Sequence, residues 1–251
     1  MSNASEKIIA VRIHAGFNAG VFLGGLLALT DQTGGMAGAY LRTLFPGIDA
    51  DVRLESASVN GIAGWRAGVA TPPEHAHRHP ADIFAMYEAS RLSQSAKEKA
   101  RAVWMTLAGA EAKVHNAPIE HVHFHEVGRL SNILAIGLCA EYLTTLSPVS
   151  IAASAVPMGD GRVRCAHGEV PYPAPATFAM LEGVPVRPFA GEGEAITPTG
   201  LAILKGFGAR FGGWPEMTVE KTATLFTPQH FEGVPNGTLF AMGSPTPKAL
   251  Q

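Results

Sequence analysis

An apolar strand followed by a glycine-bearing loop and an apolar helix is the feature that most constrains the fold. Lys7 to His14 is predicted to form a strand, and Val21 to Leu29 has apolar residues at helical spacing. The loop between them, residues 15–20, has small residues that let a backbone approach a ligand, although it matches neither a Walker A motif nor a dinucleotide fingerprint. This unit predicts an α/β fold, with a mixed sheet and flanking helices.

The rest of the chain continues this alternation of helices and strands. The dipeptide Asn60-Gly61 predicts a hairpin turn between two strands within residues 51–69. Apolar spacing predicts further helices over residues 81–90, 97–115, 133–146, 176–182 and 199–211, and further strands over residues 121–127 and 149–155.

The C-terminal third differs in composition, because eleven prolines follow Pro157. We expect loops to dominate there and to lie over a cleft shared by the first loop and the strand 121–127. Pro171, Pro173 and Pro175 favour an extended, polyproline-like segment. Residues 1–243 are predicted to form one domain, and residues 244–251 a disordered tail.

Charge and composition exclude several classes of protein. A formal charge of −2 provides no basic surface for a nucleic acid backbone. The longest apolar stretch, Val21 to Leu29, is about half as long as a membrane span requires. With no signal-peptide pattern and only Cys139 and Cys165, the sequence predicts a cytoplasmic protein that contacts neither nucleic acid nor membrane.

Six of the ten histidines fall into two short runs with i, i+2, i+4 spacing: His75, His77, His79 and His121, His123, His125. In a strand this spacing places three imidazoles on one face, where their nitrogens can converge on a divalent metal. Nickel and zinc both suit imidazole. The alternatives to metal binding are that the first run lies in a solvated loop and that the second run forms a half-exposed strand face. Glu126 is a candidate proton acceptor or a partner that orients an imidazole.

Two further groups are candidates for binding an anion. The first comprises Arg162, Arg164, Cys165 and His167, where the cysteine is also a candidate nucleophile or soft metal ligand. The second runs from Glu192 to Gly200 and includes Thr197 and Thr199. There Thr199 is predicted to cap the following helix, whose N-terminal amides favour a phosphate or carboxylate. For each group a purely structural role is the alternative.

Four motifs in order resemble the LarC family of nickel insertion proteins: residues 122–128, 164–168, 171–177 and 196–200. The resemblance implies CTP-dependent insertion of nickel into a pyridinium bisthiocarboxylic acid mononucleotide. It also implies a metal cluster of His123, His125, His121, His75, His77 and His79, with Glu126, Cys165 and His167 as catalytic residues. Arg162, Arg164, Thr197 and Thr199 would hold the nucleotide precursor. The family's CTP-binding domain would lie beyond Gln251, so we expect a separate CTP-binding subunit, and a homo-oligomer is a further expectation.

The chain departs from the family pattern at four acidic positions. Arg12 stands where the first strand of the family ends in aspartate, and Gly20 replaces an aspartate in the first loop. In the segment after Glu126, Ser131 and Ala135 replace two more aspartates. The losses remove oxygen ligands that magnesium requires, so we expect a site rich in imidazole that suits nickel or zinc. There are two alternatives to a chain that retains catalysis. One is a scaffold or partner subunit that has lost the chemistry, and the other is an unrelated hydrolase or lyase.

Overall fold

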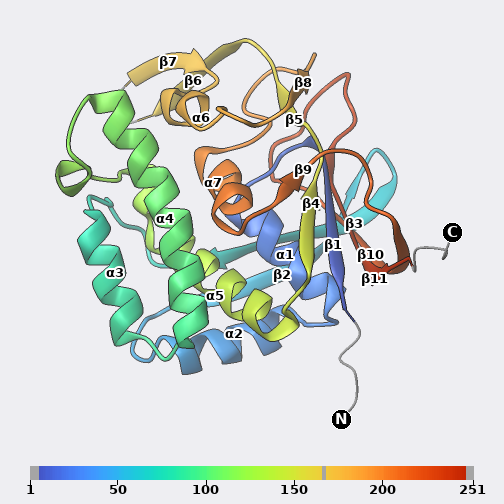
Figure 1. The fold of residues 1–251 in the computed structure, drawn as a ribbon, viewed down its shortest axis with the longest axis horizontal. Coiled ribbons are helices and arrows are strands. Elements are labelled where there is room, and N and C mark those ends of the chain that lie inside the picture. The colour runs from blue at the N-terminus through green and yellow to red at the C-terminus, as the bar shows by residue number, and fades with distance from the viewer. Residues whose placement is uncertain (1–5, 166–167, 247–251) are drawn as a thin grey trace, which may run out of the picture.

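The computed structural model describes residues 6–165 and 168–246 and contains a mixed sheet with helices packed on it (Figure 1). The main sheet has seven strands in the order β2-β3-β10-β11-β1-β4-β9. Its strands are β1 (Ile8–Ala15), β2 (Asp51–Val59), β3 (Ile62–Ala70), β4 (Ser150–Ala153), β9 (Arg210–Phe211), β10 (Met217–Leu225) and β11 (Gly237–Pro245). Parallel pairs join β1 to β4, β4 to β9 and β10 to β3, and the other neighbours are antiparallel. The predicted α/β class is confirmed.

The helices form two layers on the sheet. Helices α1 (Ala19–Leu29), α2 (Gly34–Leu44) and α5 (Leu130–Leu146) lie next to the strands. Helices α3 (Pro80–Ala89) and α4 (Gln94–His115) lie farther out, and α4 also contacts α6 (Pro175–Ala179) and α7 (Pro198–Gly206) (Figure 1). Two small sheets complete the fold: β5 (Val156–Met158) with β8 (Val186–Pro188), and β6 (Gly161–Cys165) with β7 (Gly168–Tyr172).

Helix α1 occupies the centre of the core because it is apolar on every side. Nine of its residues are buried. At Gly25 a Cβ atom would overlap the ring of Phe240 on β11, so the glycine allows the helix to approach the sheet closely. The predicted hairpin at Asn60 and Gly61 is also confirmed, since both residues have positive φ angles, as a type I′ turn requires.

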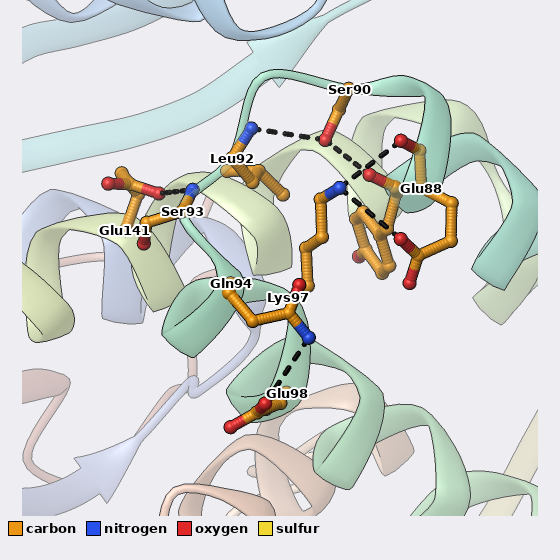
Figure 2. Close-up of polar contacts among 9 residues, drawn as sticks. Glu88, Ser90, Leu92, Ser93, Gln94, Lys97, Glu98 and Glu141 are labelled. Atoms are coloured by element: carbon orange, nitrogen blue, oxygen red, sulfur yellow. Dashed lines mark hydrogen bonds and ion pairs between the residues drawn. The ribbon is translucent and has the colours of Figure 1, made fainter.

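The junction between α3 and α4 is held by polar contacts (Figure 2). Ser93 caps α4 by accepting a hydrogen bond from the backbone N–H of Ala96, and its own N–H donates to the buried carboxylate of Glu141 on α5 at 2.8 Å. Lys97 donates to the backbone oxygen of Glu88 at 3.1 Å. These contacts fix α3, which follows the first histidine run, against α4 and α5.

Several predicted elements are wrong. Residues 121–127 form no strand: His121 ends the short helix η1 (Ile119–His121), and Glu126 and Val127 belong to the short helix η2 (Glu126–Gly128). Their alternating pattern arises because Val122 and Phe124 are buried from an irregular segment. The helix predicted over residues 199–211 ends at Gly206, and that predicted over residues 176–182 ends at Ala179.

The C-terminal third contributes more to the sheet than its composition predicts. β10 and β11 occupy central positions, so this part of the chain completes the sheet rather than lying over it. Ser244 belongs to β11, and therefore the predicted tail begins too early. The sequence analysis predicts no helix over α2, whereas Thr33 caps one there by accepting a hydrogen bond from the N–H of Met36.

Candidate metal centre

A pair of backbone hydrogen bonds brings the two histidine runs together. The N–H of Arg78 donates to the oxygen of Phe124 at 3.2 Å, and the N–H of Phe124 donates back at 2.8 Å. In this antiparallel bridge His77 lies opposite His125, and His79 lies opposite His123. Phe124 is 1% exposed and packs on Trp104 with ring centroids 5.3 Å apart, so the bridge is anchored in the core.

The side chain of Arg78 ties this bridge to α5. One guanidinium nitrogen donates to the oxygen of Gly128 at 2.8 Å, and another pairs with Glu74 at 2.6 Å. The second oxygen of Glu74 accepts from the N–H of Leu130, the first residue of α5. The hydrogen bond from Arg78 holds the pKa of Glu74 below its ordinary value. Both carboxylate oxygens of Glu74 are therefore engaged in positioning the loop.

His77, His123 and His125 form what we term the histidine trio. One ring nitrogen from each lies within 4.8 Å of those of the other two. The rings of His77 and His123 are stacked with centroids 4.4 Å apart, while His125 lies 5.3 Å from His77 and 4.9 Å from His123. Nitrogens that bind one metal at about 2.0–2.1 Å lie at most about 4.2 Å apart, so rotation of these side chains would bring the nitrogens into coordination distance. The trio can therefore hold a divalent ion.

Desolvation of the ring, together with the neighbouring imidazoles of His77 and His125, lowers the pKa of His123, although its side chain is largely exposed. The neutral imidazole is the form that binds a metal. The cluster thus favours the ligating state of its central ring.

The three other predicted histidine ligands lie outside the trio. The ring of His79 is 6.1 Å from His77, and its Nδ1–H donates to the oxygen of Val122 at 2.8 Å, which leaves Nε2 as the nitrogen with a lone pair. His75 lines the cavity beside the trio. His121 ends η1 and is exposed.

Two neighbouring cavities meet at Glu126. The first, of about 310 Å³, is lined by His77 and His125 of the trio together with Glu74, His75, Ala76, Glu126 and Arg129; we term it the histidine cavity. The second, of about 380 Å³, has Glu126 in its wall together with Asn18, Asn132, Glu194, Thr197 and Thr199; we term it the threonine cavity. The prediction that the first loop shares a cleft with the segment 121–126 agrees with this arrangement, with Asn18 and Glu126 as the residues that meet.

The threonine cavity is assembled from segments that are far apart in the sequence. The N–H of Thr197 donates to the oxygen of Phe17 at 3.0 Å, which joins the first loop to the N-terminus of α7. Thr197 caps α7 by accepting from Gly200 at 3.1 Å, so the predicted capping role of Thr199 is wrong. Thr199 is buried, and its hydroxyl lies 2.9 Å from that of Thr197.

Glu194 belongs to the candidate group from Glu192 to Gly200, but the sequence assigned it no role of its own. Its carboxyl group lines the threonine cavity, and burial raises its pKa to about 7. The sequence placed Glu194 beside the threonines, but only the structure shows that this glutamate is desolvated, whereas Glu192 two residues earlier is exposed.

Three of the four positions that lack acidic residues line the threonine cavity: Gly20, Ser131 and Ala135. The fourth, Arg12, donates to the backbone oxygens of Gly212 and Gly213 at 3.0 Å. Arg12 therefore has a structural role in joining β1 to the segment after β9.

The predicted arginine and cysteine group lies on the β6–β7 hairpin. Arg162 pairs with Glu169 at 3.3 Å, and both side chains are exposed. Arg164 is exposed and Cys165 is half-buried at the end of β6. Among the described residues, these three are not part of the wall of either cavity at Glu126. His167 lies outside the described residues.

A family profile described as nickel insertion protein matches residues 9–248. This chain belongs to the nickel insertion protein family. A relative from Geobacter metallireducens, named as a candidate nickel insertion protein, is 39% identical over 94% of this chain and 61% of its own length. A pyridinium-3,5-bisthiocarboxylic acid mononucleotide nickel insertion protein from Geobacillus kaustophilus is 44% identical over 58% of this chain and 35% of its own length.

This family member therefore spans about three fifths, or less, of the length of these curated relatives. No solved structure matches it. Within residues 6–165 and 168–246, none of the helices has the length and apolar character needed to cross a membrane.

Proposed function

We propose that this chain binds nickel(II) through His77, His123 and His125 and presents the ion for insertion into a pyridinium bisthiocarboxylic acid mononucleotide. The observation that carries the proposal is the convergence of the three ring nitrogens within 4.8 Å, in a member of the nickel insertion protein family. Imidazole nitrogen suits nickel, and zinc is the competing ion that the same donors accept. Nickel is here the cargo of the reaction.

The threonine cavity is the proposed site of the nucleotide precursor. Its volume of about 380 Å³ lies within the range of small-molecule sites, and Thr197 and Thr199 supply hydroxyl groups at the N-terminus of α7. Glu126 borders both the precursor and the metal in this arrangement. Arg162, Arg164, Cys165 and His167 would act on the precursor only if the β6–β7 hairpin approached the cavity.

The remaining parts of the proposal concern partners and location. We propose a cytoplasmic protein that works with a CTP-binding unit on a separate subunit and forms a homo-oligomer. The second candidate function, a scaffold that has lost the chemistry, predicts that the chain binds the partner without binding nickel.

Calorimetric titration with nickel tests the metal site. We expect the unmodified chain to bind one ion, and His77→Ala or His123→Ala to weaken binding by at least about tenfold because each removes a ligand. His121→Ala is the matched control, since this histidine belongs to the second run but lies outside the trio. Zinc titrations of the same proteins measure selectivity.

Two results would overturn the proposed site. One is an unmodified chain that folds but does not bind nickel, which would favour the scaffold. The other is an equal loss of affinity in His121→Ala and His123→Ala, which would place the ion elsewhere among the histidines.

A further inference from the structure

Glu126 differs from the other glutamate of the histidine cavity in having an uncommitted carboxylate. Glu74 has both oxygens engaged by Arg78 and Leu130. Among the described residues, the carboxylate of Glu126 has no hydrogen bond or ion pair, and its side chain is exposed. The hydrogen bonds at Glu126 involve its backbone oxygen, which accepts from Asn132 at 3.4 Å. The side chain is therefore free to turn while its backbone is held.

Glu126 lies next to the histidine trio and borders both cavities. Glu126 directly follows His125 of the trio, so their Cα atoms are separated by about 3.8 Å. The same residue forms part of the wall of the histidine cavity and of the threonine cavity. Among the described residues, no other side chain is shared between these two walls.

We propose that Glu126 is the transfer ligand that carries a divalent ion from the histidine trio into the threonine cavity. This inference rests on the proposed function and adds to it the residue and the direction of transfer. The step is a ligand exchange: an oxygen–metal bond to Glu126 forms as a nitrogen–metal bond to one histidine breaks. The ion stays divalent, and no electron is transferred.

The chemistry of the donors gives this step a direction. A carboxylate oxygen is a harder donor than imidazole and binds nickel less firmly, so the ion is held only briefly on Glu126. Sulfur donors of a thiocarboxylate in the threonine cavity then compete well for the ion. An amide in place of the carboxylate keeps the shape of the side chain but loses the charge that attracts the ion.

The test compares Glu126→Gln with the unmodified chain in two measurements. Calorimetry gives the affinity for nickel, and stopped-flow absorbance gives the rate at which the nickel-loaded chain metallates pyridine-2,6-bis(thiocarboxylate), a small soluble acceptor. We expect the nickel affinity of Glu126→Gln to stay within about threefold of that of the unmodified chain. Its transfer rate should be lower than that of the unmodified chain by about tenfold or more. Glu120→Gln, an exposed neighbour outside both cavities, is the matched control and should change neither value.

Removal of nickel by EDTA provides a second readout. EDTA brings its own carboxylates, so we expect Glu126→Gln to release nickel to EDTA at the rate of the unmodified chain. Circular dichroism checks that each variant folds.

The possible failures are distinguishable. If the unmodified chain binds no nickel, the proposed function fails. If the unmodified chain binds nickel but Glu126→Gln does not, Glu126 is a resident ligand and the transfer role is overturned. The same conclusion follows if Glu126→Gln binds nickel and transfers it to the thiocarboxylate at the unmodified rate.

Discussion

At the scale of single residues, neighbouring side chains of the same type have different roles because their surroundings differ. Glu74 is fixed by Arg78, whereas Glu126 is exposed and uncommitted among the described residues. Glu194 is half-buried without a hydrogen bond to its carboxyl group in the described structure. Its pKa of about 7 therefore couples folding stability to pH.

Glu194→Gln should remove this pH dependence. The pKa of Glu194 is raised in the folded state from 4.5 to about 7, so the folded chain retains a proton that the unfolded chain releases between these values. Stability falls as pH rises through that window and stays lower above it, by a cost on the order of 3 kcal/mol. We expect Glu194→Gln to be more stable than the unmodified chain at pH 8 and nearly equal to it at pH 4. Urea unfolding at both pH values measures the difference in the free energy of unfolding between the variant and the unmodified chain. An equal difference at pH 4 and pH 8 would contradict the raised pKa of Glu194.

At the scale of elements, close packing of α1 against β10 and β11 organises the core. Helix α1 holds Asn18 at its N-terminus, where this residue accepts a hydrogen bond from Val21 at 2.9 Å and lines the threonine cavity. The depth at which α1 packs therefore also sets one wall of the proposed precursor site.

Gly25→Ala tests this packing. The added methyl group would overlap the ring of Phe240, and we expect a loss of about 1–3 kcal/mol in the free energy of unfolding despite the higher helix propensity of alanine. Gly109→Ala in α4 is the control, because a Cβ there meets no atom within 4 Å and should stabilise the chain by about 0.5–1 kcal/mol. Thermal unfolding of the two variants tests this expectation. Similar unfolding midpoints would show that α1 can shift enough to accommodate the added methyl group.

At the scale of the whole molecule, strands from the two ends of the described chain lie side by side. β11 pairs with β1 over Ile8 to Ala15 and with β10 on its other side. The sheet is thus complete only when the C-terminal strand is in place.

Truncation tests this dependence. A chain of residues 1–235 lacks β11, exposes the backbone groups of β1 and β10, and removes Phe240 from the core. We expect it to lose cooperative unfolding, whereas a chain of residues 1–246 should unfold like the full sequence. Circular dichroism during heating distinguishes them, and cooperative unfolding of the shorter chain would show that β11 is dispensable.

The sequence alone determined the elements whose signals are local. The β1–α1 unit follows from apolar periodicity, and the hairpin at Asn60 follows from turn residues that tolerate positive φ. The histidine runs were also visible as candidate ligands, because their spacing is a property of the chain itself. Family motifs added the expectation of nickel, and the profile match confirmed the family.

Only the tertiary structure decided which histidines converge and what surrounds them. His77 joins His123 and His125 through a bridge between Arg78 and Phe124, residues 46 positions apart, and no local pattern encodes such a pairing. The placement of β10 and β11 depends likewise on partners far along the chain. The pKa of Glu194 and the shared position of Glu126 arise from burial and cavity shape, which form only when separate segments pack together.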